Sequence, residues 1–506
     1  MNPPANNSRA RLVGNLPRVE IESIPAAMSA ARVAQARWVG TPLATRLALI
    51  RELRHLIAEH AGQLAKDSAS ARRRPALESL TAEVLPLAEA CRFLEREAES
   101  ILATRRLGRR ALPLWLSGVR REIHREALGV VLIIGPGNYP LLLPGVQLIQ
   151  ALAAGNAVLL KPGVGGTAAA LALIELIVRA GFDSQLVSLL PESTNAALAA
   201  IEARPDKVLF TGSAATGEKI LQQLAPQLIP ATMELSGSDA VVVRADADLD
   251  LATRALVFGL SLNAGATCMG PKRLFVHRSI ATELEGRLAR AFPIELSLRL
   301  APAVSASVRP MLEQALAAGV HFIAGGLHED GSVLAPAVLG GATPGSRLLR
   351  EDIFAPVLVV VTVANDDEAV TRANDCSFAL GASVFTRDQT AARQLAARLN
   401  AGVVSINDLI VPTADAQVPF GGRRRSGFGV TRGAEGLLEL TAPKVVTVSR
   451  SKFRPAFDPP HPKDEAMFQA YLQLTHGRSL CQRARALLAL LKSLSGRTKH
   501  SKQSTL

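Results

Sequence analysis

The order of apolar and polar residues divides the chain into a helical first part and a longer part in which strands and helices alternate. Residues from about 25 to 105 carry apolar side chains at helical spacing, as at Leu47, Ile50 and Leu53, which predicts long helices. The next segment, ALGVVLIIGPGNYP at residues 127–140, is almost continuously apolar and ends in Gly and Pro. This pattern is typical of a buried parallel strand that leads into a functional loop.

Beyond residue 140 the pattern predicts further strands separated by helices. Helices are expected at Leu143–Ala154 and Ala168–Ala180. The expected strands are Ala157–Lys161, Leu186–Leu190, Lys207–Thr211, Ala240–Val243, Lys272–His277, Val357–Val363 and Gly402–Ile406. Strands that alternate with helices of roughly 10 to 15 residues indicate βαβ units and doubly wound parallel sheets. The alternation begins again at Glu234 and continues to about Asp415, which predicts a second α/β unit.

Two segments lie outside this alternation. Residues 419–446 are rich in Gly and Arg and lead into the strand-like KVVTVS, and the composition changes to Pro, His and Lys after Ser451. That change marks a linker and a separate tail. An arginine-rich patch lies near residues 105–125, and its part at 114–122 fits an extended arm and a solvated helix surface equally well.

Length and charge limit the class of protein. A chain of 506 residues with 48% hydrophobic and 20% charged residues is expected to form two or three domains with a large interior. The formal net charge is +13, and eleven Lys or Arg against three acidic residues place +8 of it in residues 450–506. A nucleic-acid-binding protein carries its basic residues along a folded face. We therefore expect no nucleic-acid partner.

The cysteines and the apolar runs bear on location. The four cysteines lie far apart, with no CxxC pair and no histidine cluster, so they predict neither a metal site nor a disulfide framework. The first fifteen residues lack the apolar stretch of a secretory signal. No run reaches the roughly 18 apolar residues of a membrane span. The expected location is the reducing cytoplasm.

Three segments combine a reactive or polar side chain with small residues. Cys268 lies in NAGATCMGP at residues 263–271, where small neighbours leave room for a substrate carbonyl beside the thiol. Glu234, in MELSG, can deprotonate water if it lies near a thioester. Asn138, in GPGNYP, follows a buried strand and offers an amide to a developing oxyanion. Taken alone, each also fits an ordinary structural cysteine, a solvated acid or a turn.

Two further segments fit a dinucleotide. LLKPG at residues 159–163 places Lys161 just past an apolar strand, where open α/β sheets bind ligands. FTGSAATG at residues 210–217 is not G-x-G-x-x-G, but a strand followed by Gly, Ser and a helix start still offers backbone N–H groups to a pyrophosphate. A surface lysine and a plain strand-to-helix turn are the alternatives.

The order and spacing of these five segments resemble those of the aldehyde dehydrogenase superfamily from about residue 25 to 448, most closely its shorter, class-3-like members that act on apolar aldehydes. EDIFAP at residues 351–356 and PFGGRRRSGFG at residues 419–429 resemble two more of its elements. The resemblance implies an α/β fold with two doubly wound parallel-sheet domains and a small β oligomerisation arm. A homodimer or homotetramer is the expected assembly.

The resemblance also implies a role for each part of the chain. Residues 1–233 would form a Rossmann-like cofactor-binding domain, with about 106–125 contributing to the arm, and residues 234–415 a catalytic domain. Residues 416–449 would form an oligomerisation and bridging segment. Residues 450–506 would form a basic tail with one amphipathic helix.

The implied activity is NAD(P)-dependent oxidation of an apolar aldehyde to a carboxylic acid through a cysteine thiohemiacetal and a thioester. Cys268 would be the nucleophile, Glu234 the general base, and the Asn138 amide with the Cys268 backbone N–H the oxyanion donors. No metal is implied. The residues implied for binding NAD or NADP are Pro136, Lys161, Gly212, Ser213, Thr216, Gly217, Leu235, Asp352 and Phe354.

Several positions depart from the family pattern. The resemblance implies Trp where this chain has Gly137, and Glu where it has Val164 and Asp352. It implies Gly where this chain has Ser236, and Gln where it has Ala266. Val164 removes an acid that disfavours a 2′-phosphate, so NAD and NADP both remain open, and either Asp352 or Glu351 would grip the nicotinamide ribose. The departures leave two alternatives: an enzyme that reduces acyl groups to aldehydes with NADPH, and a catalytically silent binding or scaffold protein.

The tail predicts one helix with an apolar face between Ser479 and Ser495. Its apolar side chains are Leu480, Ala484, Leu487, Leu488 and Leu491. Arg483 and Lys492 lie away from that face. The segment therefore resembles a basic amphipathic helix that lies on an anionic membrane surface. A helix packed on a partner subunit, with a disordered basic end, is the alternative.

Overall fold

The computed structural model describes residues 19–69, 74–108, 110, 112–113, 116, 118–292, 298–300, 302–327, 333–450, 457, 459–460 and 462–500. These residues form two compact units. The larger unit consists of the described residues of Met1–Arg105 and Ile123–Lys444, and the smaller one of those of Arg106–Glu122 and Val445–Leu506.

The first half of the larger unit is built on a six-stranded sheet with the order β18-β7-β6-β3-β4-β5. The strands are β3 (Val130–Ile134), β4 (Ala157–Lys161), β5 (Val187–Leu189), β6 (Lys207–Gly212), β7 (Ala231–Leu235) and β18 (Gly427–Phe428). All neighbours are parallel except β18, which runs antiparallel to β7. The carboxyl ends of β3, β4, β6 and β7 therefore meet along one edge.

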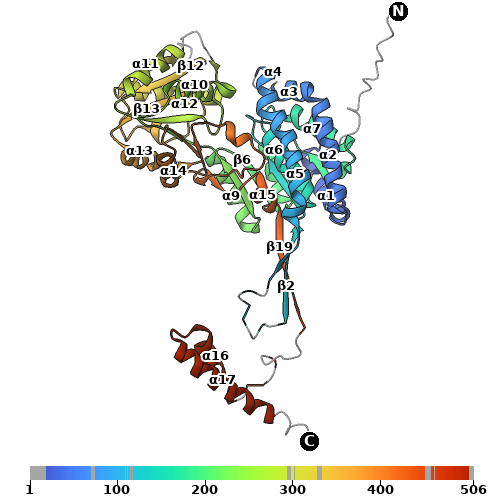
Figure 1. Cartoon of the computed structure of the whole chain (residues 1–506). Helices are drawn as coiled ribbons and strands as arrows, with labels where there is room; N and C mark the ends of the chain where they lie inside the picture. The colour runs from blue at the N-terminus through green and yellow to red at the C-terminus, as the bar shows by residue number, and fades with distance from the viewer. Residues whose placement is uncertain are drawn as a thin grey trace, which may run out of the picture. The chain divides into compact units, whose positions relative to one another are not determined.

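Helices cover this sheet (Figure 1). They are α1 (Ile24–Trp38), α2 (Leu43–Glu59), α3 (Ala61–Ala69), α4 (Ala76–Ser79), α5 (Leu85–Leu102), α6 (Leu142–Ala154), α7 (Thr167–Arg179), α8 (Thr194–Glu202) and α9 (Ala214–Leu224). Every residue of α6 is buried, because it contacts β3 and β4 on one side and α5 on the other. Such a central helix is apolar all round, as its sequence is.

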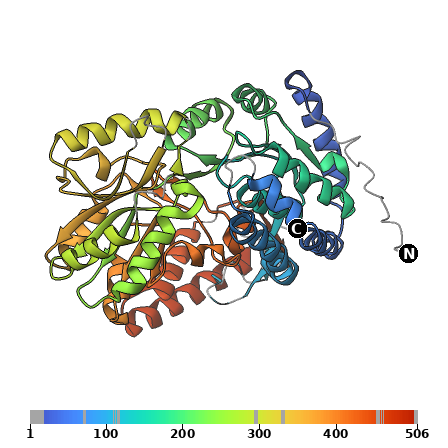
Figure 2. The ribbon, with the colours of Figure 1, turned by 90° about the horizontal axis from the view of Figure 1, so that it is seen from above.

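The second half of the larger unit is built on an eight-stranded sheet with the order β10-β12-β13-β9-β8-β15-β16, to which β11 adds beside β12. Its strands are β8 (Asp239–Val243), β9 (Pro271–His277), β10 (Leu298–Arg299), β11 (His321–Leu327), β12 (Val333–Gly340), β13 (Val357–Val363), β15 (Gly381–Phe385) and β16 (Val403–Ile406). Its helices are α10 (Leu249–Ser261), α11 (Ala281–Ala291), α12 (Pro302–Ala317), α13 (Asp366–Asn374) and α14 (Gln389–Arg398). Figure 2 shows the two halves side by side.

Strand β8 shows why the predicted strands are continuously apolar. Ala240 and Val242 point into the core on one face of the second sheet, and Val241 and Val243 into the core on the other. Alternate side chains of a strand face opposite sides, so a sheet covered by helices on both faces requires apolar residues at every position.

The predicted α/β fold with parallel sheets is confirmed. Strands β4 and β13 have the predicted bounds, four others differ by one residue at one end, and β5 is one residue shorter than predicted at each end. The predicted boundary between residues 233 and 234 falls inside β7, so Glu234 belongs to the first sheet. The chain then passes directly from β7 into β8 of the second sheet.

A three-stranded sheet has the order β1-β2-β19. Its strands are β1 (Arg105–Leu107), β2 (Val119–Ala127) and β19 (Thr441–Ser449). Residues 114–122 fitted both an extended arm and a solvated helix in the sequence, and the last four of them, residues 119–122, lie in strand β2. Two short strands, β14 (Phe378–Ala379) and β17 (Arg423–Arg424), pair with each other, and helix α15 (Gly433–Leu438) precedes β19.

The prediction of a single helix in the tail is wrong, because the tail contains two. Helices α16 (Asp464–His476) and α17 (Leu480–His500) pack against each other. Among the side chains that the structure describes in these helices, the buried apolar ones are those of Met467, Ala470 and Ala486. The Pro- and Lys-rich composition before residue 464 concealed α16, whose first turn carries two acidic residues, as helix N-termini prefer. Among the described residues, no helix is both long and apolar enough to cross a membrane.

Candidate active site

The segment before Cys268 has an unusual backbone. Asn263, Ala264 and Gly265 have φ angles of 51°, 53° and 74°, so three consecutive residues adopt the left-handed conformation. For alanine this conformation is strained and needs support from its surroundings. The Asn263 backbone N–H donates to Glu78 Oε1 (2.8 Å), and its side-chain amide donates to the backbone oxygen of Asn138 (2.9 Å). These bonds tie the segment to the first half of the unit.

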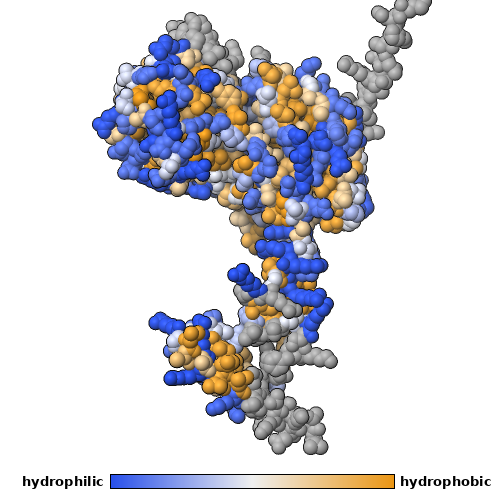
Figure 3. All heavy atoms as spheres, in the orientation of Figure 1, coloured by the Kyte–Doolittle hydropathy of each residue, from blue (hydrophilic) through white to orange (hydrophobic). Residues whose placement is uncertain are grey.

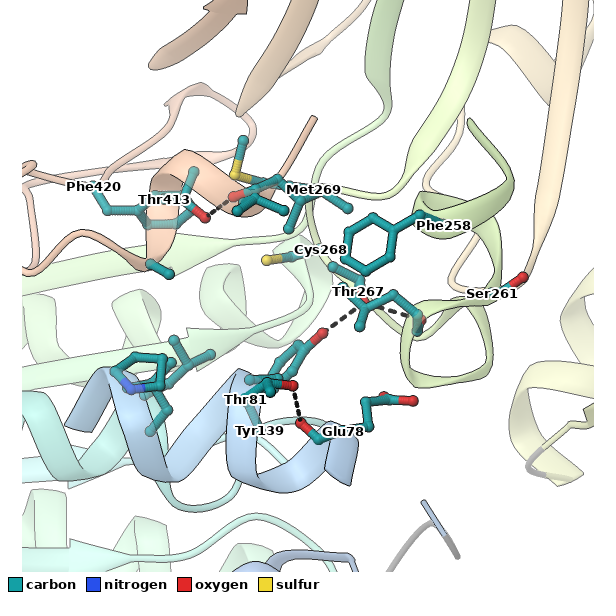
Figure 4. Close-up of a pocket in the computed structure, with 18 of the residues that line it drawn as sticks. Glu78, Thr81, Tyr139, Phe258, Ser261, Thr267, Cys268, Met269, Thr413 and Phe420 are labelled. Atoms are coloured by element: carbon teal, nitrogen blue, oxygen red, sulfur yellow. Dashed lines mark hydrogen bonds between the residues drawn. The ribbon is translucent and has the colours of Figure 1, made fainter. Parts of the chain in front are cut away.

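Cys268 is half-buried, and its sulfur points into open space between Phe420 and Tyr139 (Figure 4). Burial raises the pKa of the thiol to about 12, and the carboxylates of Glu234 and Asp239 contribute to the rise. Both effects disfavour the charged form of an acid. The resting thiol is therefore protonated at neutral pH.

Asn138 faces the segment that carries Cys268. Its buried side-chain amide donates a hydrogen bond to the backbone oxygen of Ala266 (3.1 Å). A primary amide has two N–H groups, and this bond uses one of them. The next residue makes a second link, because the Tyr139 hydroxyl lies 2.8 Å from the hydroxyl of Thr267 (Figure 4). The loop after β3 is thus held beside the segment that carries Cys268 at two successive residues.

Glu234 lies in strand β7, between Thr211 of β6 and Gly427 of β18. The side chain is buried, and the Thr431 hydroxyl donates to its Oε2 (3.3 Å). Its Oε1 has no hydrogen-bond partner among the described residues. Burial raises the pKa of the carboxyl, and the nearby Arg432 cation and Thr431 oppose the rise. A raised pKa moves a carboxylate toward the range in which a general base works best.

Two cavities meet at Cys268. The larger has a volume of about 620 Å³ and contains, besides Cys268, the residues Pro75, Leu77, Glu78, Thr81, Ala82, Pro86, Tyr139, Leu142, Leu143, Phe258, Ser261, Leu262, Thr267, Met269, Ile410, Val411, Thr413, Ala414, Phe420 and Arg432. The smaller has a volume of about 280 Å³ and is lined by Pro136, Gly137, Asn138, Leu143, Thr211, Gly212, Ser213, Glu234, Leu235, Ser236, Cys268, Asp352 and Phe354. We call them the apolar cavity and the polar cavity. Cys268 and Leu143 line both.

The topology explains the composition of the polar cavity. The residues that follow β3, β6 and β7 lie at the carboxyl edge of the first sheet, where open α/β sheets bind ligands. Cys268 precedes β9, and Asp352 and Phe354 precede β13, so they lie together at the amino edge of the second sheet. The polar cavity lies where these two edges face each other.

Nine of the residues predicted from the sequence line this cavity, and three do not. Lys161 ends strand β4 beside Ile134, is largely buried and has its pKa lowered by burial, which nearby Glu192 opposes. Ser213 caps helix α9 by accepting a hydrogen bond from the Thr216 N–H (3.3 Å). A Cβ on Gly217 would lie 2.9 Å from a methyl group of Leu235, so glycine permits the close packing of α9.

The structure separates the two acids before β13. Asp352 lines the polar cavity, and burial raises its pKa. Glu351 instead forms an ion pair with Arg347 on the surface (2.5 Å). Asp352 is therefore the acid that can reach a ligand in the polar cavity.

The loop after β3 accommodates no bulky residue at Gly137. A Cβ at this position would lie 2.8 Å from the backbone oxygen of Val164. The loops that follow β3 and β4 approach each other at this point, so the tryptophan that the resemblance implies at this position would have to displace one of them. The Val164 side chain is 80% exposed.

Sequence patterns missed several residues of the site. Thr431 and Arg432 come from the segment before α15, and Phe258 comes from α10. They belong to no short motif, and Val430 separates Thr431 from the GFG at residues 427–429. The burial of Arg432 is visible only in the structure, so no sequence signal pointed to this residue.

A half-buried thiol and a buried carboxylate line one cavity at the carboxyl edge of a doubly wound sheet, which is the place where such sheets bind nucleotides. Residues 3–446 match the model of the aldehyde dehydrogenase family, and the chain belongs to this family.

Relatives of known sequence or structure match this chain along nearly its whole length. A 4,4'-diapolycopene aldehyde oxidase of Methylomonas sp is 31% identical over 488 residues, which cover 94% of this chain and 91% of that protein. The NAD+ complex of an aldehyde dehydrogenase from Bacillus cereus has a TM-score of 0.79 and 29% identity, and the match covers 86% and 90% of the two chains. An NADP-dependent enzyme of E. coli has a TM-score of 0.79 at 25% identity, with 86% and 91% covered.

Proposed function

We propose that the protein oxidises an apolar aldehyde to the carboxylic acid with NAD or NADP, through a thioester on Cys268. The position of Cys268 carries this proposal, because its thiol lines both the apolar and the polar cavity. An aldehyde that enters from the apolar side and a nicotinamide that enters from the polar side would meet at one sulfur atom. Such a meeting of two reactants at a fixed nucleophile is what catalysis by proximity requires.

The polar cavity fits the dinucleotide. Helix α9 directs its N-terminal N–H groups toward Gly212 and Ser213, which is an arrangement that binds phosphate. Asp352 supplies a carboxylate for ribose hydroxyls on the opposite wall. Lys161 lies at the end of β4, next to the same edge, where it would bind the adenosine ribose. The relatives include an NAD+ complex and an NADP-dependent enzyme, which supports either cofactor.

The proposed steps use three side chains. The Cys268 sulfur attacks the aldehyde carbon, and the Asn138 amide with the Cys268 N–H donates to the oxygen that becomes negative. A nicotinamide held in the polar cavity would supply the hydride acceptor, and loss of the hydride would leave a thioester on Cys268. Glu234 then takes a proton from water, whose oxygen attacks the thioester, and the acid and the free thiol are released. The Oε1 atom of Glu234, which has no partner among the described residues, is available for that proton.

The apolar cavity supports the substrate class. Its volume of about 620 Å³ is typical of a site that encloses a small organic molecule. Phe258, Leu262, Met269 and Phe420 surround the space beside Cys268, and Glu78 and Arg432 are its charged lining residues. A chain of methylene groups would gain about 0.8 kcal/mol for each group buried there.

A screen of linear aldehydes of increasing length tests the proposal. We expect NAD(P)H to form without coenzyme A and kcat/KM to rise with chain length until the cavity is full. Cys268→Ser should abolish this activity while cofactor binding persists, because a hydroxyl is a much weaker nucleophile. Cys481→Ser, at the exposed cysteine of the tail, is the control. NAD(P)H formation that survives in Cys268→Ser would exclude the mechanism.

The same screen decides between the remaining alternatives. An acyl-reducing enzyme would need its thioester to survive water, which a base beside Cys268 opposes. It would consume NADPH with an activated acyl group and show no oxidation of aldehydes. A silent scaffold protein would bind the cofactor without turnover.

The proposal also covers assembly and location. We place the protein in the cytoplasm, which its four free cysteines support, and we expect a homodimer or homotetramer from its membership of the family. The α16–α17 hairpin carries the apolar side chains of Phe468, Leu472, Leu480 and Leu488 on its surface, each at least half exposed. A partner subunit and an anionic membrane surface are the two candidates for covering them.

A further inference from the structure

Arg432 has a backbone conformation that is otherwise almost restricted to glycine. Its φ and ψ angles are 62° and 173°. A side chain in this region is strained, and it persists only where the surroundings impose it. Here the two neighbours are fixed: Thr431 exchanges two backbone hydrogen bonds with Phe420 (2.7 Å each), and the Gly433 N–H donates to Ala416 (3.0 Å). Strained residues of this kind cluster at functional sites.

The strained backbone directs a cation into the apolar cavity. Arg432 is 8% exposed and lines this cavity together with Cys268. Its guanidinium lies 4.9 Å from the ring centre of Phe420 and donates a hydrogen bond to the backbone oxygen of Thr413. Both contacts hold the group in place without neutralising it. A buried cation requires a compensating negative charge nearby.

Two groups beside Arg432 can supply that charge. Glu234 and Cys268 are the acids whose attraction opposes the lowering of the Arg432 pKa by burial. In return, the Arg432 cation opposes the rise of the pKa of both acids. A thiolate and a carboxylate buried near each other repel each other, and a cation near both relieves this repulsion.

Other charged groups around Cys268 do not replace Arg432. Asp239 in β8 raises the pKa of the Cys268 thiol. Tyr139 in the loop after β3 is a neutral phenol, because burial raises its pKa. Lys272 in β9 is buried, which lowers its pKa to about 8, and its ammonium is bound to the backbone oxygen of Ala355. Glu234 in β7 is the partner acid itself.

We infer that Arg432 is a positioning residue for the reaction, whose fixed charge favours the ionised forms of Cys268 and Glu234 in the same buried site. The inference rests on the proposed function for the roles of the two acids. It predicts that the loss of the charge moves the ionisation of the Cys268 thiol to higher pH. It also predicts that the strained backbone of Arg432 holds the guanidinium in place and has no other effect on the ionisation of Cys268.

Three variants separate the charge from the strain. Arg432→Met keeps the length of the side chain and removes the charge. Arg432→Lys keeps the charge. Arg432→Gly removes the charge and relieves the backbone strain, so it should unfold at a higher temperature than Arg432→Met. The glycine variant keeps the test open if the methionine variant folds poorly.

The measurement is the rate at which iodoacetamide alkylates Cys268 as a function of pH, resolved by mass spectrometry in a Cys481→Ser background. The Cys481→Ser background removes the exposed thiol. Alkylation requires no turnover, so the measurement does not depend on the proposed activity. We expect Arg432→Met and Arg432→Gly to shift the profile upward by on the order of one pH unit, which is about tenfold less thiolate at a given pH. Arg432→Lys should keep the native profile.

The kcat/KM values of the three variants give the second reading. Arg432→Met and Arg432→Gly should lose kcat/KM in the same proportion as they lose thiolate, and Arg432→Lys should retain it, whereas a purely structural defect would lower kcat/KM without lowering the rate of alkylation. Alkylation profiles that coincide for the native protein and Arg432→Met would overturn the inference. A higher KM confined to aldehydes that carry a carboxylate, with an unchanged alkylation profile, would also overturn it and assign Arg432 to substrate binding.

Discussion

Replacement of Glu234 by Gln is expected to uncouple the two halves of the reaction. The amide has the shape of the carboxylate and can still accept the Thr431 hydrogen bond, so the fold should be retained. It cannot take a proton from water. We therefore expect the thioester to form and then to persist.

The structure indicates how far the two rates should separate. With a thiol pKa of about 12, roughly one Cys268 in 10⁴ is thiolate near pH 8. The loss of the Glu234 charge removes one of the two carboxylates that raise this pKa, so attack should be maintained or accelerated, by a factor on the order of ten. Hydrolysis should slow by about 10² to 10⁴, which is the usual contribution of a general base.

Rapid mixing of the Glu234→Gln variant with aldehyde and NAD or NADP tests this expectation. A burst of about one NAD(P)H per active site should precede slow turnover. In the native protein the rate of hydrolysis should rise with pH through a pKa above that of an ordinary carboxylate, because burial raises the pKa of Glu234 and the base acts when deprotonated. This rise should be absent in the variant. Equal slowing of the burst and of steady turnover would refute the role of Glu234.

Two other substitutions test the cofactor site. Val164→Glu should weaken NADP binding far more than NAD binding through repulsion of the 2′-phosphate, with the neutral Val164→Gln as the control, and equal Kd changes in titrations would show that this exposed side chain does not face the adenosine ribose. Asp352→Asn should raise the KM for the cofactor about tenfold or more through loss of a charged hydrogen bond. Glu351→Gln, at the acid bound to Arg347, should leave this KM unchanged. If Glu351→Gln raises the KM more than Asp352→Asn does, then Glu351 and not Asp352 is the acid that contacts the cofactor.

The strands could be predicted because their environment is simple. In a parallel sheet covered by helices on both faces, every residue of a strand is buried, as Val242 is, so a continuous apolar run predicts the strand directly. The motifs around Asn138, Glu234 and Cys268 could be found because each occupies a loop or strand end with a restricted set of small neighbours. Their meeting at one cavity follows from the strand order, in which the carboxyl edge of one sheet faces the amino edge of the other.

Arg432 could not be predicted by the same means. Its importance comes from a backbone conformation imposed by Phe420 and Ala416, and no local pattern encodes contacts between segments that lie apart. Helix α16 was missed for a different reason. Met467 and Ala470 are buried against α17 and not against a large core, and the other apolar residues include the exposed Phe468 and Leu472, so the pattern is short and weak. The Pro- and Lys-rich residues before it also indicate a linker.

The tail offers a final prediction, which depends on the side chains it exposes. In α17, Leu480 and Leu488 are 84% and 62% exposed, although Ala486 is buried against the hairpin. Basic side chains, among them Arg483 and Lys492, accompany these leucines. Exposed apolar groups with basic neighbours are typical of segments that bind anionic lipid surfaces. The same apolar groups would also suit a contact between subunits.

Truncation of the chain after Ser451 distinguishes these two partners. If the hairpin binds lipid, the full chain should float with vesicles that contain anionic lipid, and the truncated chain should not. Salt should weaken this binding, because the basic side chains contribute to it. Vesicles of neutral lipid are the control. If both chains float equally, the hairpin does not bind the membrane; a truncated chain that sediments as a smaller assembly would instead place the hairpin between subunits.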